Sequence, residues 1–271
     1  TRRISTPFPN PYDYGFYLSL PFCYCTIRSL RSKISSKERI TFILLSLISI
    51  IGIILTQSRT GFIILTFEAF VIPTVLILER SFSLKALIFS KKIIKYVFLL
   101  LIMVFFIRIF YITYGENFGY LFNSIERIVF EGSIGGSGTT RLNLIELAIE
   151  NAGNDFLVFL FGSGPSKAIL KNPEAGYAYF IFRYGFSTLF FFFFFPLLIS
   201  ISLLVKIIKA KIIDSSIYLA ILAWYLSVPV VYLATNATEQ IRLSFIYYFL
   251  MGFIVKSYFI LPNKEPKKLH K

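Results

Sequence analysis

Apolar runs separated by short polar segments are the main pattern along the chain. Seven such runs occur, most of them close to the roughly 20 residues that a helix needs to cross a hydrocarbon core of about 30 Å. They predict an all-α integral membrane protein with about seven transmembrane helices. The first run is short for a span, and the fifth is long enough to tilt or to begin outside the core. The predicted spans are approximately 14–27, 40–56, 62–78, 96–113, 176–205, 216–235 and 241–261.

The composition agrees with this pattern. Hydrophobic residues make up 56% of the 271 residues and charged residues only 15%, and the mean hydropathy is +0.72, which excludes an ordinary soluble domain. We expect residues 1–271 to form a single polytopic membrane domain. Because the chain opens in a polar loop and does not begin with Met, we also expect it to be a C-terminal portion of a longer protein.

The net charge of +14 is explained by membrane topology. The alternate loops 28–39, 79–95 and 206–214 and the tail from Lys256 hold 18 Lys and Arg residues against four acids, so they are predicted to face the cytoplasm. Residues 1–13 then form an outer loop, 114–175 a large extracytoplasmic loop and 262–271 a cytoplasmic tail. With the basic excess explained in this way, we expect no nucleic-acid partner.

The two sides of the membrane also differ in the kind of basic residue. The inner segments hold 14 Lys and four Arg, whereas the outer segments hold two Lys and eight Arg. A guanidinium binds phosphate or carboxylate through two parallel hydrogen bonds. This bias predicts an anionic ligand on the outer face. Pairing of the outer arginines with the nine outer acids is the alternative explanation.

The outer loop 114–175 is too long for a simple connection and is the predicted functional element. Within it, apolar residues at helical spacing predict an amphipathic helix that begins at Arg141, with Thr139 or Thr140 as its N-cap, and ends at Gly153. Such a helix could lie on the membrane or on the other helices. Arg141 would then stand in the first turn, beside free backbone N–H groups that favour an anion.

Several short motifs occur in the order found in the O-antigen polymerase and ligase superfamily. Residues 58–61 (SRTG), between the second and third spans, resemble that superfamily's SR-x-G turn. The large outer loop with Arg141 leading a helix follows, and then come 161–164 (FGSG) and 174–185 (EAGYAYFIFRYG), which resemble the FGxG element and the YG-containing helix entry. Together with the upstream stretch STPFPNPYDYGFYL, the resemblance covers roughly residues 5–250.

The resemblance implies a Wzy-type polysaccharide polymerase. Such an enzyme joins polyprenyl-pyrophosphate-linked repeat units into O-antigen or capsular polysaccharide on the outer side of the bacterial inner membrane. Its partners would be these lipid-linked glycans, the bilayer, a chain-length regulator and a flippase. In the ligase branch a histidine precedes the Tyr of the helix entry. Here that position is Glu174, and the only histidine of the chain, His270, lies in the predicted cytoplasmic tail.

Two alternatives to a polymerase stay open. One is a ligase that transfers the finished polymer to another acceptor, although the absence of its characteristic histidine disfavours it. The other is a flippase or transporter for lipid-linked oligosaccharides, which would be expected to show paired broken helices and charges at the midplane. Here the charges gather at the outer ends of the predicted spans, and Glu68 alone lies in the middle of one.

The implied reaction assigns roles to particular residues. The pyrophosphate leaving group needs a cationic clamp and the acceptor hydroxyl needs a base. The sequence has no Asp/Glu pair at DxD spacing and no Cys/His set, which predicts catalysis without a metal or cofactor. The predicted catalytic residues are Arg59, Arg141 and Arg183 in the clamp and Glu174 as base. The predicted substrate-binding residues are Tyr177, Tyr179, Arg242 and Arg3.

Polar side chains inside the predicted spans need a separate explanation. Glu68 lies in the middle of the third span and must be protonated or paired, and we expect structural pairing within the helix bundle. Cys23 and Cys25 lie in the first span, one residue apart, and point in different directions on a helix. They are expected to be packing residues and not a disulfide or metal pair.

Overall fold

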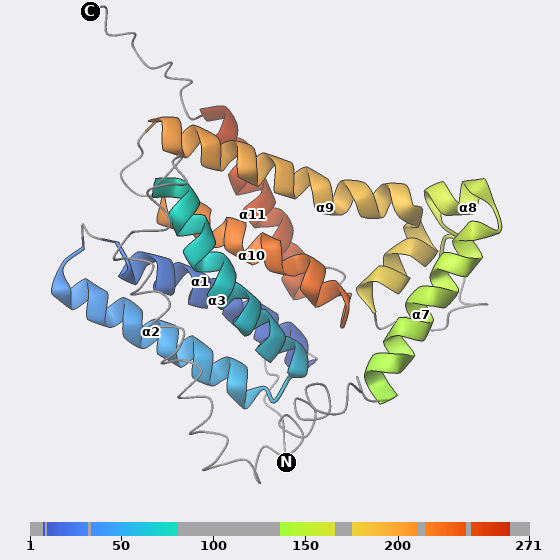
Figure 1. Ribbon diagram of the computed structural model, residues 1–271, viewed down its shortest axis with the longest axis horizontal. Helices are drawn as coiled ribbons and strands as arrows, with labels where there is room; N and C mark the ends of the chain where they lie inside the picture. The colour runs from blue at the N-terminus through green and yellow to red at the C-terminus, as the bar shows by residue number, and fades with distance from the viewer. Residues whose placement is uncertain are drawn as a thin grey trace, which may run out of the picture.

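The structure, a computed structural model, describes residues 8, 10–31, 34–80, 136–165, 175–210, 215–236 and 240–260. Within these ranges the chain is all-α and forms eight helices (Figure 1). The predicted span 96–113 and the predicted tail 262–271 lie outside the described residues.

Every predicted span inside the described ranges coincides with a helix. These helices are α1 (Pro11–Ser29), α2 (Ser36–Leu55), α3 (Arg59–Arg80), α9 (Gly176–Ala210), α10 (Ser216–Tyr232) and α11 (Ile241–Ile260). In α2, α3, α9 and α11 the apolar stretch is long enough to cross a membrane, and α10 is a shorter apolar helix. The chain is therefore a membrane protein with several candidate spans. Two further helices belong to the predicted outer loop: α7 (Gly136–Gly153) and α8 (Phe156–Phe161).

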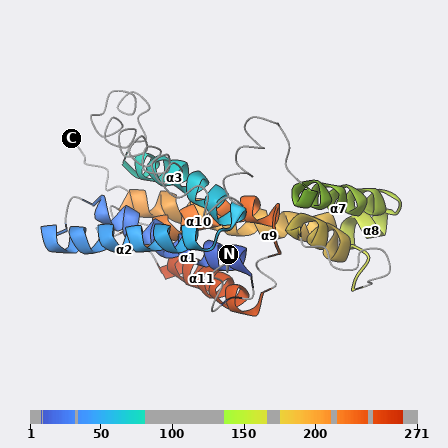
Figure 2. The ribbon, with the colours of Figure 1, turned by 90° about the horizontal axis from the view of Figure 1, so that it is seen from below.

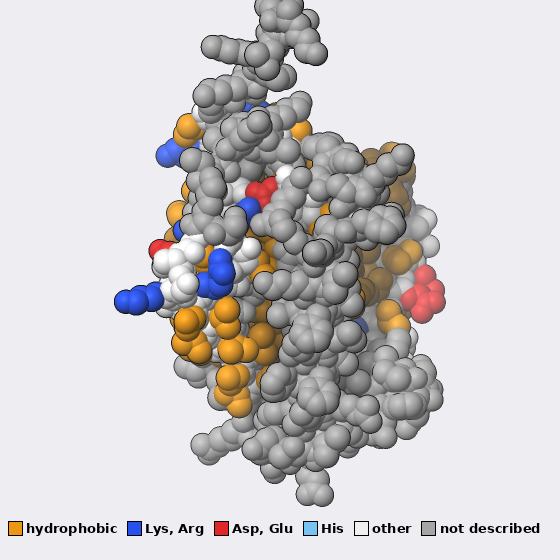
Figure 3. Space-filling view, turned by 60° about the vertical axis from the view of Figure 1, so that its left-hand side comes forward, with side chains coloured by type: hydrophobic (Ala, Val, Ile, Leu, Met, Phe, Trp, Pro, Cys, Tyr) orange, Lys and Arg blue, Asp and Glu red, His pale blue; other side chains and the backbone are white. Residues whose placement is uncertain are grey.

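The outer surface of the helix bundle is apolar, as a lipid-facing surface must be. Most of α2 is exposed although its sequence is almost wholly aliphatic, and on α9 the side chains of Phe190 and Phe194 are about half exposed. Figure 3 shows hydrophobic side chains beside Lys and Arg side chains at the end of the molecule where α2 begins. This juxtaposition fits a helix that leaves a basic membrane surface and enters hydrocarbon.

The interior of the bundle is built mainly on α1, α3 and α10 (Figures 1 and 2). The ring of Trp224 on α10 stacks on Phe16 of α1 with centroids 4.5 Å apart, and its Nε1 donates to the Phe16 carbonyl over 3.0 Å. The buried indole thereby keeps its polar group satisfied. Cys23 and Cys25 are buried and free, and Cys23 belongs to the hydrophobic core of the bundle, as expected of a packing residue.

One end of the bundle is closed by a charged network. Arg31, just after α1, donates two hydrogen bonds to Glu79 of α3, over 2.8 and 3.0 Å. It also donates to the hydroxyls of Ser215 and Ser216 at the start of α10. Two-point contact between guanidinium and carboxylate fixes geometry as well as charge. The network therefore ties three helices together at the end predicted to face the cytoplasm.

The fifth predicted span is two helices, not one. The backbone leaves helical geometry at Gly185, with φ 76° and ψ 177°, so α9 consists of a first part before this residue and a second part after it. A continuous helix of 35 residues would be longer than a helix needs to be to cross the hydrocarbon core of the bilayer. The second part runs from Phe186 to Ala210, and its apolar stretch up to Lys206 contains about the 20 residues that cross about 30 Å. Lys206 marks the end of this stretch, and its ammonium donates to the Tyr258 carbonyl over 2.8 Å.

The predicted start of the loop helix was wrong. The helix α7 begins at Gly136, so Thr139 and Thr140 lie inside it and Arg141 stands in its second turn. The extension runs through two glycines despite their low helix propensity. Packing of the buried Ala148 and Ala152 against the first part of α9 supplies the stability that the local sequence lacks.

Candidate functional site

Four chain segments meet at the end of the bundle opposite the Arg31 network. They are the first turn of α1, the start of α3, the end of α10 and the start of α9. Glycines allow the close approach: a Cβ on Gly15 would lie 3.1 Å from Cα of Gly61, and a Cβ on Gly176 would lie 2.6 Å from the Thr235 carbonyl oxygen. This is the end to which the sequence assigns the candidate clamp and the substrate.

The turn that precedes α3 is built from its own side chains. The Ser58 hydroxyl accepts from the N–H of Gly61 over 3.1 Å and so caps the helix. The Thr56 hydroxyl accepts from the N–H of Ser58 over 3.2 Å and donates to the Ile53 carbonyl. Gln57 takes φ 50°, which turns the chain from α2 into α3. The SRTG motif is therefore a buried, internally bonded turn and not a loose surface connection.

Arg59 is the first residue of α3 and is half-buried, while its neighbours Ser58 and Thr60 are buried. The sequence predicted an arginine held at a turn by two adjacent helices, and the structure places it in this way. Buried neighbours on both sides fix the backbone of Arg59. The N–H groups at the start of α3 give this end of the helix a partial positive charge.

A buried carboxylate lies at the same end of the bundle. Asp13, in the first turn of α1, is fully buried. It accepts hydrogen bonds from Asn10 Nδ2 over 3.1 Å and from the Thr235 hydroxyl over 3.3 Å. These contacts join the start of α1 to the residues that follow α10. The stretch STPFPNPYDYGFYL, which the sequence singled out, contains Asn10 and Asp13. No local pattern pointed to Thr235, because its contact with Asp13 spans 222 residues.

Arg183 lies two residues before the break in α9, and Tyr179 lies one helical turn before it. The guanidinium donates to the Tyr179 hydroxyl over 2.5 Å and stands 4.7 Å from the centre of its ring. The predicted sharing of one helix face is therefore confirmed. The buried Tyr179 therefore helps to hold the Arg183 guanidinium in place, whereas its predicted role in substrate binding stays a prediction.

The two glycine motifs of the sequence are in direct backbone contact. Gly162 and Gly185 both take positive φ, and each packs against the backbone of the other segment. A Cβ on Gly162 would lie 2.4 Å from the carbonyl carbon of Arg183, and a Cβ on Gly185 would lie 2.4 Å from that of Leu160. Two backbone hydrogen bonds join the FGSG segment to the part of α9 before the break. The N–H of Ser163 donates to the Phe182 carbonyl over 2.7 Å, and the N–H of Gly164 donates to the Arg183 carbonyl over 3.2 Å.

We refer to α7, α8 and the first part of α9 as the arm. Its segments are held together by the contact between the glycine motifs, by the Asn151 amide, which donates to the Ser163 hydroxyl over 2.8 Å, and by the alanine packing of α7 on α9. Figures 1 and 2 both place the arm at one end of the molecule. The backbone of Arg183 is thus fixed by the arm, as that of Arg59 is fixed by the bundle.

The other predicted site residues divide into four groups. Arg141 is half-buried in the second turn of α7, where its own N–H group lies inside the helix, so the predicted anion site at a helix start does not form around it. Tyr177 donates to the Pro229 carbonyl over 2.9 Å and so contributes to packing. Arg242 is exposed near the start of α11. Arg3 and Glu174 lie outside the described residues.

Glu68 lies in the middle of α3 and is fully buried. Its Oε1 accepts a hydrogen bond from the Ser227 hydroxyl of α10 over 3.1 Å. The expected pairing within the bundle therefore takes the form of a hydrogen bond between two helices. Charged side chains are costly at this depth, so a carboxyl group held by a serine fits a neutral, protonated acid.

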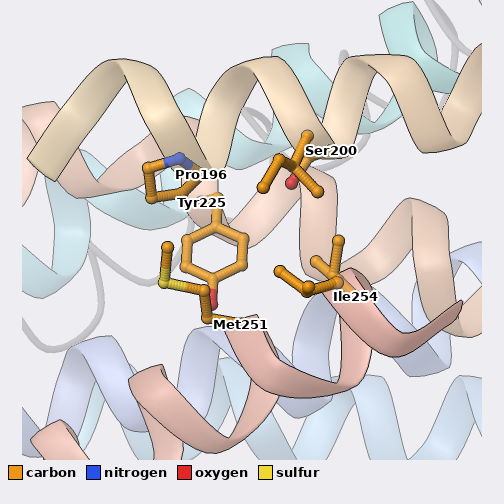
Figure 4. A pocket seen from close by; sticks show the side chains of 7 residues that line it. Pro196, Ser200, Tyr225, Met251 and Ile254 are labelled. Atoms are coloured by element: carbon orange, nitrogen blue, oxygen red, sulfur yellow. The ribbon is translucent and has the colours of Figure 1, made fainter. Parts of the chain in front are cut away.

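Two apolar hollows occur between the described helices. A groove of about 370 Å³ is lined by Phe70 and Val75 of α3, by Ile201 of α9 and by Leu222 of α10. A smaller gap between α9, α10 and α11 lies beside Ser200 (Figure 4) and has no room for a water molecule. Neither hollow is lined by a charged residue, and no cluster of metal-binding side chains occurs in the described part of the chain.

Comparison with known proteins identified no match, whether to a family model, to a curated protein or to a solved structure.

Proposed function

We propose that this protein is a metal-independent glycosyltransferase that polymerises polyprenyl-pyrophosphate-linked oligosaccharides into O-antigen or capsular polysaccharide. The observation that carries the proposal is the buried SRTG turn, which holds Arg59 rigidly at the end of the bundle. The sequence of this turn resembles the SR-x-G turn of the polymerase and ligase superfamily. The contact between the FGSG segment and the YG of α9 adds support, because two motifs of that resemblance meet in space.

The reaction needs few chemical groups. An acceptor hydroxyl oxygen attacks the anomeric carbon of the donor, and the bond from that carbon to the pyrophosphate oxygen breaks. The electron pair of this bond leaves with the pyrophosphate, and Glu174 takes the hydroxyl proton. Arg59 and Arg183 stabilise the charge that develops on the leaving group, a contribution typically worth about 3–4 kcal/mol per donor.

The membrane arrangement in this proposal has seven spans, with the Arg59 end of the bundle outside the cell. The described end that carries Arg31 and Glu79 then faces the cytoplasm. The positive-inside distribution of the loops supports this orientation. Residues 114–175, which include α7 and α8, would form the extracytoplasmic loop of a bacterial inner-membrane protein.

Thiol labelling tests this orientation. Lys37→Cys, at the exposed start of α2, should resist a membrane-impermeant maleimide in intact cells and react after permeabilisation. Glu150→Cys, exposed on α7, should react in intact cells. The wild type is the matched control, since both of its cysteines are buried. Labelling of Lys37→Cys in intact cells would invert the topology and remove the proposed outer clamp.

Glycan extension in isolated membranes tests the chemistry. Glu174→Gln keeps the size of the side chain but removes its basicity, so extension should fall by about 10²-fold or more. Binding of the lipid-linked donor should change little, because the arginines are intact. The wild type should stay active in EDTA. A fully active Gln variant would exclude Glu174 as the base, and activity lost in EDTA and restored by magnesium would exclude a clamp made of arginine alone.

Deletion of the gene separates the polymerase from its alternatives. Glycans limited to a single repeat unit indicate a polymerase. Complete polymer left on its lipid carrier indicates a ligase, and lipid-linked units accumulating in the cytoplasm indicate a flippase. The last two results would each overturn the proposal while leaving the described fold unaffected.

A further inference from the structure

The short helix α8 exposes an unusual amount of apolar surface. All six of its residues are hydrophobic (FLVFLF), and none is buried. The exposed fractions are 73% for Phe156, 63% for Leu157 and 64% for Phe161. Exposure of such a segment to water would cost free energy, because the transfer of large aromatic and aliphatic side chains out of water is the most favourable.

Contacts with α9 define the level of α8 relative to the membrane. The Leu160 carbonyl accepts a hydrogen bond from the Ser187 hydroxyl and packs against Gly185. These two residues stand at the break and in the first turn of the second part of α9, which has the length of a span. The helix α8 therefore lies level with one end of a candidate transmembrane helix, where headgroups meet acyl chains.

The backbone of α8 is suited to an environment poor in water. At its start, the Asp155 carboxylate accepts from the N–H of Leu157 over 2.7 Å. At its end, the N–H of Gly162 bonds to the Val158 carbonyl over 2.8 Å, and Ser187 satisfies the Leu160 carbonyl. One N–H group at the start of α8 and two carbonyl groups near its end thus have partners within the protein, an arrangement that the bilayer favours.

The apolar face of α8 continues onto the surface of α9. Phe159 stacks on Phe186, with ring centroids 4.7 Å apart. One and two turns further along the same face of α9 are Phe190 and Phe194, with exposed fractions of 53% and 47% and stacked rings. The exposed side chains of α8 therefore extend the lipid-facing surface of a candidate span.

We infer that α8 is embedded in the membrane leaflet nearest Gly185 and anchors the arm to lipid acyl chains. It is too short to span the bilayer and lies at its interface, with Asp155 at the polar edge. Through the backbone contacts of Gly162 with Arg183 and of Gly185 with Leu160, this anchor fixes the level at which the backbone of Arg183 is held. The inference depends on the membrane character of the chain and is independent of the proposed reaction.

Spin-label accessibility measures the depth directly. Phe156→Cys and Leu157→Cys are labelled in the full-length protein, which is reconstituted into phosphatidylethanolamine and phosphatidylglycerol vesicles. Collisions with oxygen, which concentrates in hydrocarbon, are compared with collisions with a water-soluble nickel chelate. Phe190→Cys serves as the lipid-facing reference and Glu150→Cys as the aqueous one. Substitution at these exposed positions removes no described side-chain hydrogen bond.

We expect the two α8 labels to show an oxygen-to-nickel collision ratio several-fold above that of the Glu150→Cys label and close to that of the Phe190→Cys label. A ratio equal to the Glu150→Cys value would place α8 in water and overturn the inference. Protection from both reagents would also overturn it, since it would indicate a protein partner, such as a second copy of this chain, covering α8. An absence of glycan extension by the wild type, together with the expected collision ratio, would count against the proposed function alone.

Discussion

Gly185→Ala should reduce glycan chain extension by about 10²-fold while the protein stays in the membrane. The backbone there has φ 76° and ψ 177°, a region used almost only by glycine, where another residue costs about 1–3 kcal/mol. The new methyl carbon would also lie 2.4 Å from the carbonyl carbon of Leu160. The α8 segment must then separate from α9, and Arg183 loses the contact that fixes its backbone. A shift of about 1 Å at a catalytic group can cost 10²-fold in rate.

Other glycines of the arm provide matched controls. Gly164 has φ 72°, but a methyl group added there would meet no atom within 4 Å, so Gly164→Ala isolates backbone strain from overlap. Gly153 has neither feature, and Gly153→Ala should behave as wild type. Extension in membranes should therefore fall in the order Gly153→Ala, Gly164→Ala, Gly185→Ala.

Limited proteolysis of the reconstituted proteins supplies a structural measurement beside activity. Cleavage within the arm should be fastest in Gly185→Ala, because separation of α8 exposes the FGSG segment. If Gly185→Ala resists protease like the wild type and extends glycan normally, the contact between the two glycine motifs has no role in holding the site. A variant with a loosened arm and normal extension would separate the arm from catalysis.

Arg59→Lys should reduce extension by about 10²–10³-fold, the typical cost of losing one preorganised donor. Lysine keeps the positive charge but cannot form two parallel hydrogen bonds to a phosphate. The backbone of the turn should change little, since the hydrogen bonds among Thr56, Ser58 and Gly61 hold it and the substitution leaves them intact. Amounts of protein in the membrane should therefore equal those of the wild type.

Arg39→Lys is the matched control for this substitution. Arg39 is exposed at the opposite end of the bundle, where it donates to the Arg31 carbonyl over 3.1 Å, and a lysine can make a similar contact. Measurement of initial extension rates across donor concentrations distinguishes binding from turnover. Normal extension by Arg59→Lys would show that charge alone suffices and would contradict a pyrophosphate clamp at the SRTG turn.

The kcat and donor KM of Arg59→Lys provide a second test of the clamp. If the clamp acts mainly on the charge that develops as the bond breaks, kcat falls and the donor KM changes little. If Arg59 binds the ground-state pyrophosphate equally well, KM rises and kcat stays near the wild-type value. The half-buried, preorganised position of Arg59 favours the first pattern.

The sequence alone predicted the apolar helices α1, α2, α3, α9, α10 and α11, of which α2, α3, α9 and α11 are long and apolar enough to cross a membrane. It did not predict the helix α8. Apolar runs such as 40–56 and 241–261 correspond to α2 and α11 within a few residues, because the bilayer imposes length and hydropathy on each span separately. The spacing of Tyr179 and Arg183 likewise predicted their contact, since neighbours on a helix are set by local geometry. The position of Arg59 between two helices also followed from the local pattern.

Contacts between distant segments were decided only by the tertiary structure. The run 176–205 did not reveal the break at Gly185, because the break depends on a backbone contact with Leu160, which lies 25 residues earlier in the chain. The start of α7 at Gly136 was missed for a similar reason, since its stability comes from alanine packing on α9. The Asp13 contact with Thr235 joins opposite ends of the chain. Hydropathy reports how each segment meets lipid, whereas close packing between helices depends on shape, which appears only when the segments meet.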